Sequence, residues 1–430
     1  MWPRSFWYRI YEPFIRKAAG FGVASKEHDK ERYEHKYEYC DLLIAGSGPS
    51  GLASAYAAAK NGARVILAED KPRFGGSLLT SDVSINNQSG KEWADNIITE
   101  LKGMTNVTVK NRAQIFGYYD HNMLVMSERV TDHLPKSEEF TPKQRLWYIR
   151  AKQVVISSGS IERPIVFGNN DTPGVVLASA AKEYMKVYGV LVGKKPVVFT
   201  NNDSAYETAI EFKKNNINPI VLDSRQDSNS EIIKEAKSLG IDIKFSHVVV
   251  AAKGYKKVKS CDIAEISEDK QNLNQIKNIE CDCICVSGFW TPTIHLASQS
   301  GGKTKFKEEI DAFVPDKSKQ KEVTLGSANG VFTLEETLKT SFDKGFELSK
   351  AITNNNNSQQ IPKVSEKKHS KHDKFWCVPL PKGKKYKRFL DFQNDVAVSD
   401  IELAIREGYR SIEHVKRYTT LGMATDQGKT

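Results

Sequence analysis

The sequence predicts an α/β fold built from two similar strand–helix segments and a small helical module at the end of the chain. In the first segment, residues 39–69 read as an apolar strand, a glycine-rich turn, an alanine-rich helix and a second apolar strand. In the second segment, KKPVVFTNNDSAYETAIEFKKNN reads as a strand and a helix, and PIVLDS supplies the next strand. A chain of 430 residues is long enough for the two lobes that this order of elements predicts.

The turn of the first segment has the spacing GxGxxG, formed by Gly46, Gly48 and Gly51. Gly46 permits a tight turn, Gly48 lets the backbone approach a pyrophosphate, and Gly51 allows the helix to pack closely on the strand. The helix opens at Pro49, and its unpaired N–H groups and positive dipole end favour an anion. The turn therefore predicts a dinucleotide-binding domain of the Rossmann type.

An acidic residue at the end of the second strand strengthens this prediction. Glu69 follows Gly46 by 23 residues, where a carboxylate accepts hydrogen bonds from the adenosine ribose diol. A carboxylate disfavours a ribose 2′-phosphate, so NAD or FAD is expected rather than NADP. A second glycine loop, Gly75-Gly76-Ser77, comes next and is expected against the pyrophosphate or ribose. Including neighbouring residues and later glycine turns, the predicted cofactor site consists of Gly46, Gly48, Pro49, Gly51, Glu69, Asp70, Gly75, Gly76, Ser77, Gly159, Gly326 and Asn329.

The turn of the second segment, TNNDSAY from Thr200, contains no glycine. Side chains there would block a pyrophosphate, and Asp203 would repel it. Asp203 is expected to cap the following helix. The sequence thus predicts one dinucleotide site and a degenerate second domain.

The formal charge of +10 is concentrated in one stretch of the chain. Residues 363–388 hold ten Lys/Arg against two acids, and the polar text around them predicts a flexible, solvated linker and no nucleic-acid site. No run of about 20 apolar residues predicts a membrane span, and no signal-peptide core is recognisable, so the cytoplasm is the expected location.

Six cysteines form no CxxC pair, which excludes dithiol chemistry of the thioredoxin reductase type. Cys281, Cys283 and Cys285 alternate along a predicted strand, so all three are expected on one face as small buried hydrophobes. The nine histidines fit no metal or nucleophile pattern; His295 and His414 are the two in notable surroundings. No metal site and no catalytic residue is predicted.

These patterns predict the following domain boundaries. Residues 1–38 form an aromatic-rich arm whose helical spacing is disturbed by Pro13, 39–170 with 300–352 form the dinucleotide-binding domain, 171–299 the degenerate domain, 353–386 a linker and 387–430 a small helical module.

Stretches along nearly the whole chain closely resemble the α subunits of heterotetrameric sarcosine oxidase. They are WYRIYEPFIRKAAG, CDLLIAGSGPSGLASA, RFGGSLL, FTNNDSAY, SGFWTPTIHLASQSGGK, and FLDFQNDV through HVKRYTTLGMATDQGKT. SSGSIERP, which contains Gly159, also resembles the crossover between the two nucleotide domains of flavoprotein disulfide reductases. The resemblance implies a flavoprotein-like fold with two FAD/NAD(P)-binding-type domains.

The resemblance also implies an activity, the oxidative demethylation of sarcosine to glycine and hydrogen peroxide, with the one-carbon unit captured by tetrahydrofolate. In that family the α subunit carries NAD, the β subunit carries FAD, and a covalent FMN lies near the α/β boundary; γ and δ subunits complete the complex. By this resemblance the glycine turn holds NAD, and the segment around Lys416 to Lys429 approaches the FMN phosphate.

Two differences from related proteins limit what the resemblance implies. The chain looks like the central part of an α subunit, between a ferredoxin-like and an aminomethyltransferase-like domain, so folate binding is not assigned to it. The last module resembles a small iron–sulfur domain of related amine and opine dehydrogenases, but the cluster positions hold Asp391, Gln393 and Asp426, which are poor iron–sulfur ligands. No cluster is predicted.

Three functions stay open on the sequence. The chain is an NAD-carrying subunit of a sarcosine oxidase whose flavin chemistry lies on a partner, a self-sufficient FAD-dependent pyridine-nucleotide oxidoreductase, or a non-catalytic nucleotide-binding fragment.

Overall fold

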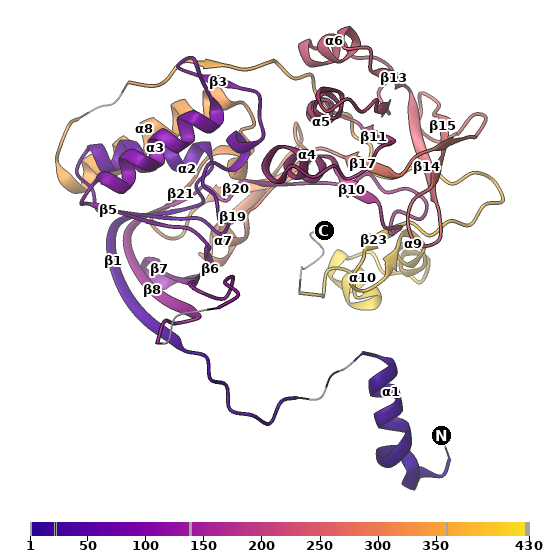
Figure 1. The fold of residues 1–430 in the computed structure, drawn as a ribbon, viewed down its shortest axis with the longest axis horizontal. Helices are drawn as coiled ribbons and strands as arrows, with labels where there is room; N and C mark the ends of the chain where they lie inside the picture. Colours follow the sequence, from indigo (N-terminus) through magenta and orange to yellow (C-terminus); the bar gives the residue numbers. More distant parts are fainter. Residues whose placement is uncertain (1, 21, 23, 137–139, 358–359, 426–430) are drawn as a thin grey trace. The chain divides into compact units, whose positions relative to one another are not determined.

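The computed structural model describes residues 2–20, 22, 24–136, 140–357 and 360–425 (Figure 1). It divides into a small unit, residues up to Glu34 with Arg129–Arg145, and a large unit, His35–Glu128 with Leu146–Thr430. None of the helices within the described ranges is both long and apolar enough to cross a membrane.

The small unit contains three consecutive helical segments, η1 (Arg4–Phe6), η2 (Trp7–Tyr11) and α1 (Glu12–Ala18). Pro13 does not end the helical stretch, but the winding changes there: the residues before it form the π-helical η2, and Pro13 stands in the first turn of α1. None of the residues of η1, η2 and α1 is buried.

The first domain of the large unit is built on a sheet with the strand order β5-β2-β1-β8-β7-β6, and β21 pairs with β8. Its strands are β1 (Tyr33–Ala45), β2 (Val65–Ala68), β5 (Val107–Lys110), β6 (Ala113–Tyr119), β7 (Met123–Arg129), β8 (Gln144–Ile156) and β21 (Glu322–Thr324). β1 begins six residues before the predicted Tyr39, and β8 begins nine residues before the predicted residue 153. The added part of β1 was missed because it is mostly polar, whereas the added part of β8 contains an apolar run at residues 146–149 that the prediction overlooked.

Helices α2 (Pro49–Lys60), α3 (Gly90–Gly103) and α8 (Leu334–Thr353) cover one face of this sheet (Figure 1). α8 lies directly on α2, because a Cβ added to Gly345 would stand 2.5 Å from the carbonyl oxygen of Ser54. α8, which follows the second domain in the sequence, therefore belongs to the first domain.

The second domain has a five-stranded parallel sheet with the order β10-β17-β11-β12-β13. Its strands are β10 (Val175–Leu177), β11 (Pro196–Thr200), β12 (Ile220–Asp223), β13 (Asp242–Phe245) and β17 (Cys283–Ser287). One face packs on α4 (Ala178–Tyr188), α5 (Ser204–Lys214) and α6 (Glu231–Ser238), and the other on the antiparallel sheet β14 (His247–Lys253), β15 (Ser260–Glu265) and β16 (Lys277–Glu280).

The remaining elements are short. They are η3 (Gly76–Leu79), β3 (Ser84–Ile85), β4 (Gln88–Ser89), η4 (Asp120–Asn122), β9 (Ser160–Glu162), β18 (Trp290–Pro292), α7 (His295–Gln299), β19 (Lys303–Lys307), β20 (Ala312–Lys317), η5 (Gly326–Asn329), β22 (Val364–Ser365), β23 (Phe389–Asp391), β24 (Val396–Ala397), α9 (Val398–Arg406) and α10 (Ile412–Thr419).

The cysteine prediction is right about burial but wrong about the common face. Cys283 and Cys285 lie in β17 and pack with the helices, whereas Cys281 precedes a bend at Asp282 and packs against the opposite side of the sheet. The bend breaks the two-residue alternation on which the prediction depended.

The prediction of a flexible linker is wrong for residues 363–378. Within this segment β22 pairs with β3, Phe375 and Val378 are buried, and Val378 donates its N–H to the carbonyl of Val166. Backbone hydrogen bonds, which composition does not reveal, hold the segment in place.

Candidate dinucleotide-binding site

The glycine-rich turn lies where β1 ends and α2 begins. Gly46 has a φ of +101°, a conformation that strongly favours glycine, and its N–H donates to the carbonyl of Ala68 on β2 over 2.8 Å. A Cβ on Gly51 would stand 1.9 Å from the Gly46 carbonyl oxygen. Ser157, at the end of β8, donates its hydroxyl to this same carbonyl over 2.9 Å. The turn therefore has no room for a side chain at Gly46 or Gly51.

The second glycine loop lies against the first. The N–H of Gly75 donates to the carbonyl of Ser47 over 3.0 Å, and a Cβ on Gly76 would stand 2.8 Å from the Cα of Gly48. A Cβ on Gly48 itself would meet no atom within 4 Å. No side chain caps the first turn of α2, so its N–H groups face the open space beside Gly48.

Glu69 follows β2 and holds the turn by its carboxylate. One oxygen accepts the N–H of Ser47 over 2.9 Å and its hydroxyl over 2.5 Å, and the other accepts the N–H of Lys71 over 3.0 Å. A carboxylate offers about four lone-pair positions, and these three donors together with Asp70 take them up, so a ribose hydroxyl would have to replace one of these partners. Burial raises the pKa of Glu69, and a hydrogen bond with Asp70 raises it further.

A cavity of about 2110 Å³ extends from these loops to the second domain. Of the predicted site residues, those on its wall are Gly46, Gly48, Pro49, Glu69, Asp70, Gly76, Ser77, Gly159 and Gly326. Gly51 and Gly75 lie behind this wall and support the loops. Asn329 does not line the cavity, because it comes at the end of η5, beyond Gly326, whose Cα faces Ser50 of α2.

The opposite wall of the cavity carries buried ionisable groups. Glu162, at the end of β9, accepts the N–H of Ser179 in the first turn of α4 over 2.7 Å, and burial raises its pKa. The imidazole of His372 stacks on Phe289 with 4.0 Å between ring centroids, and burial lowers its pKa although Asp311 lies 3.5 Å away. His372 is therefore neutral near pH 7.

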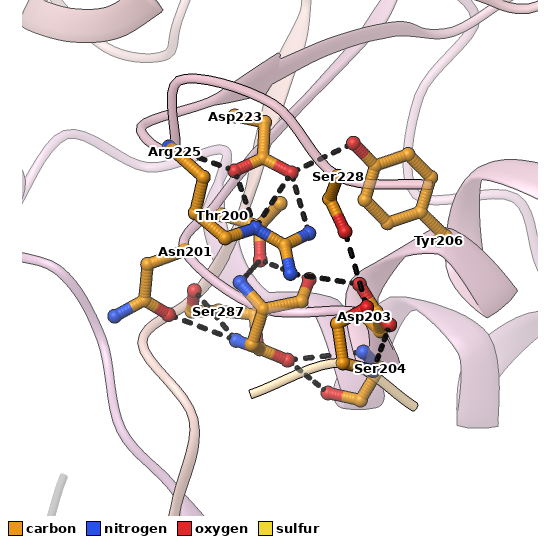
Figure 2. A network of polar contacts seen from close by, with 11 residues as sticks. Thr200, Asn201, Asp203, Ser204, Tyr206, Asp223, Arg225, Ser228 and Ser287 are labelled. Atoms are coloured by element: carbon orange, nitrogen blue, oxygen red, sulfur yellow. Dashed lines mark hydrogen bonds and ion pairs between the residues drawn. The ribbon is translucent and has the colours of Figure 1, made fainter. Parts of the chain in front are cut away.

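The turn of the second domain is filled by its own side chains (Figure 2). Asn202 accepts the N–H of Ser204 over 3.0 Å and so caps α5. Asp203 does not act as the predicted cap, because its carboxylate is engaged elsewhere. One oxygen accepts the N–H of Ser370, and the other lies 2.8 Å from Nη1 of Arg225, an ion-pair contact without hydrogen-bond geometry.

Arg225 also binds the acid that ends the second strand of this domain. Its Nη2 lies 2.7 Å and its Nε 3.2 Å from one oxygen of Asp223, and Nε lies 3.0 Å from the other; Tyr206 donates its hydroxyl to the same carboxylate (Figure 2). Burial alone lowers the pKa of Arg225, but the bonds to Asp223 raise it, so the guanidinium stays charged. Asp223 holds the position that Glu69 holds in the first domain, but here an internal cation occupies it.

Sequence reasoning missed three parts of this site. Ser47 and Ser157 hold the glycine turn, and residues 366–372 line the cavity although they were assigned to a linker. The only sequence signal for the last part is the set of apolar residues Val364, Phe375 and Val378 within polar text.

The predicted positions in the last module have structural contacts or fall outside the described residues. Asp391 accepts the N–H groups of Gln393, Asn394 and Gly422, which fixes the loop after β23. Lys416 lies in α10. Asp426 and Lys429 lie outside the described residues.

The pyridine nucleotide-disulphide oxidoreductase family matches residues 40–325, which include the glycine turn, Glu69 and the second domain. The chain belongs to this family. Residues 385–430 also match the sarcosine oxidase A3 domain.

The similarity to relatives extends over the whole chain. The chain is 37% identical to the sarcosine oxidase subunit alpha of Rhizobium meliloti (strain 1021) over 100% of this chain and 42% of that protein. It is 35% identical to the subunit alpha of Corynebacterium sp. (strain P-1) over 96% of this chain and 43% of that protein. The chain thus spans less than half the length of these relatives.

A solved structure supports the fold assignment. The crystal structure of L-proline dehydrogenase from P. horikoshii matches with a TM-score of 0.65 and 19% identity, over 95% of this chain and 74% of that chain. The FAD/NAD(P)-binding-type fold predicted from the sequence is confirmed by this match and by the family assignment.

Proposed function

We propose that this chain is the dinucleotide-carrying part of a sarcosine oxidase α subunit, and that it binds NAD while the flavin that oxidises sarcosine lies on a partner subunit. The similarity to subunit alpha sequences along the whole chain supports the complex. The contrast between the two turns supports the division of labour: only the first has open space at an uncapped helix N-terminus.

The residues present fit a dinucleotide at the first turn. The open space at Gly48 and the uncapped N–H groups of α2 suit a pyrophosphate, and Glu69 lies on the cavity wall, where a ribose hydroxyl can replace one of its present hydrogen-bond partners. The carboxylate of Glu69 would repel a 2′-phosphate, which favours NAD over NADP. FAD at this turn is the alternative that has to be tested.

A nicotinamide dinucleotide can accept a hydride directly from a substrate or a reduced flavin, but in the proposed complex sarcosine is oxidised on the partner's flavin. We infer that the dinucleotide has a structural role in the α subunit, and that β, γ and δ subunits complete the enzyme. An FMN near the segment that contains Lys416 belongs to the same proposal. The reaction proposed for the whole complex is the oxidation of sarcosine to glycine, with hydrogen peroxide as product and the one-carbon unit passed to tetrahydrofolate.

Exposed apolar side chains in the last module support a partner contact. Ile405 of α9 and Ile412 of α10 are 60% and 68% exposed. Both are large apolar side chains, and their exposure leaves them available to another subunit.

Binding and activity measurements test this proposal together. The purified chain is titrated with NAD, NADP and FAD by calorimetry, and sarcosine-dependent peroxide is measured with and without a co-expressed β subunit. We expect NAD to bind at one site per chain and peroxide to form only with the partner. Stoichiometric FAD on the chain alone, or sarcosine oxidation without a partner, would overturn the proposal.

A further inference from the structure

Residues 363–378, named the strap here, connect the two domains of the large unit along the cavity. At its first end, the strap joins the dinucleotide domain. β22 pairs with β3 with Val364 opposite Ile85, and the N–H of Lys363 donates to the Asn86 side chain over 2.8 Å. The carboxylate of Glu366 accepts the N–H groups of Leu334 and Glu335 over 2.8 and 3.0 Å. Glu366 thereby caps α8, which lies on α2 of the glycine turn.

At its other end, the strap joins the second domain at the turn that Figure 2 shows. The N–H of Ser370 donates to Asp203 over 2.6 Å, and the N–H of Asp373 donates to the carbonyl of Asn201 over 2.9 Å. The amide of Asn201 donates back to the carbonyl of Asp373 over 2.7 Å. Asp373 also forms an ion pair with Lys270. The strap therefore lies on the edge of the second sheet where a nucleotide would otherwise bind.

The part of the strap between these ends forms a wall of the cavity. Residues 366–372 all line it, together with the glycine turn and Glu69. The anchors at the two ends differ in depth: Asp203 and Asn201 are buried, whereas the first end consists of a two-residue strand and the partly exposed carboxylate of Glu366. The first end is consequently the one that opens more easily.

Other contacts hold the two domains together away from the strap. Lys71, two residues after Glu69, forms an ion pair with Glu183 of α4 over 2.9 Å, and Arg73 donates to the carbonyl of Val187 over 3.2 Å. Lys186 and Lys214 both pair with Asp82. Opening the cavity at the strap therefore does not require the domains to separate.

We propose that the strap is a clamp that closes the cavity over the bound dinucleotide and opens at its Glu366 end to let the dinucleotide enter or leave. This inference rests on the proposed dinucleotide site. A clamp of this kind slows entry and exit together, because both need the same open state, and it leaves the equilibrium affinity nearly unchanged. A residue that only contacts the ligand would change the exit rate and the affinity instead.

The first test is to weaken the anchor. In Glu366→Ala both backbone hydrogen bonds to α8 are lost. We expect association and dissociation rates for NAD to rise together by about tenfold or more, because the loss of even one charge-assisted hydrogen bond has an effect of about tenfold. Glu366→Gln keeps an acceptor and should show a smaller rise. Glu335→Ala is the matched control: it removes the same charge from the cavity wall, but the Glu335 side chain does not hold the strap. Rates are measured by stopped flow with the fluorescent analogue etheno-NAD and an NAD chase.

The second test is to lock the anchor. Ser84 and Ser365 face each other in the β3–β22 pair, so Ser84→Cys with Ser365→Cys can form a reversible cross-link there. Oxidation, followed by thiol titration, should slow both rates by about tenfold or more, and reduction should restore them.

The outcomes separate the clamp from the site on which it acts. If NAD does not bind the unmodified chain, the proposed function fails, and the clamp fails with it. If NAD binds but both rates are unaffected by Glu366→Ala and by the cross-link, only the clamp is refuted. A change in the dissociation rate alone also refutes it, because it would show a direct contact with the ligand.

Discussion

The buried ion pairs of the second domain give the sharpest stability prediction. Arg225 is 7% exposed and contacts the carboxylates of Asp223 and Asp203, which are almost fully buried. Arg225→Met keeps much of the apolar length of the side chain but removes the guanidinium. Two carboxylates then stay in a low-dielectric setting without their cation.

The expected loss is large because it includes the cost of leaving charges unpaired. Removing one member of a buried ion pair typically costs about 3–5 kcal/mol, and here one cation serves two anions, so we expect at least this range. Replacing all three polar partners, in Asp203→Asn/Asp223→Asn/Arg225→Met, should recover most of the loss. The amides still accept from Ser370 and Tyr206, and no unpaired charge is left.

Hydrogen exchange read by mass spectrometry gives the local free energy of opening for peptides of β11, α5 and β12. These peptides should lose protection in Arg225→Met and regain most of it in the triple variant, while NAD affinity at the first turn stays the same. A loss below about 1 kcal/mol would show that the ion pairs do not hold this turn together. Weakened NAD binding with intact protection would mean instead that Arg225 serves the ligand.

Three further predictions concern the cofactor site and the partner surface. Gly48→Ala should fold normally, since the added methyl meets no neighbour, yet lose NAD affinity in calorimetry. Gly51→Ala should instead lower the melting temperature, because its Cβ would stand 1.9 Å from a carbonyl oxygen. Equal effects of the two substitutions would contradict the site geometry. Because burial raises the pKa of Glu69 above the ordinary value of 4.5, its carboxylate takes up a proton at a higher pH than a free carboxylate does. NAD affinity should therefore begin to fall on acidification before the pH reaches 4.5. In Glu69→Gln, NAD should bind weakly, and its affinity should not change with pH over this range. Ile405→Glu and Ile412→Glu should change unfolding free energy by only about 0.5 kcal/mol but weaken co-purification of a β subunit, and unchanged co-purification would place the partner elsewhere.

The first turn was predictable because each of its geometric requirements restricts the residue type that can stand at a given position. A φ near +100° favours glycine at position 46, a close carbonyl excludes any Cβ at position 51, and an acid at the strand end appears directly as Glu69. The absence of glycine in the second turn was equally readable. These are local requirements, and the sequence states them within 30 residues.

The failures come from contacts between distant parts of the chain. Asp203 has the residue type and place of a helix cap, but Arg225 and Ser370 bind its carboxylate. The sequence from Asp223 to Arg225 does not predict whether the guanidinium contacts carboxylates of the protein or the phosphate of a ligand. Only the fold brings the cation between two buried carboxylates.

The strap shows why composition alone misplaces a segment of this kind. The strap is held by backbone N–H and C=O groups, which nearly every residue carries, and by one carboxylate at a helix N-terminus. Its sequence therefore has the composition of a linker. The same property suits a clamp: a segment with few buried side chains loses little apolar contact when it opens, so hydrogen bonds at one end can control the opening. If Glu366→Ala speeds entry and exit of NAD equally, the polar composition that made the strap resemble a linker is also what allows it to open.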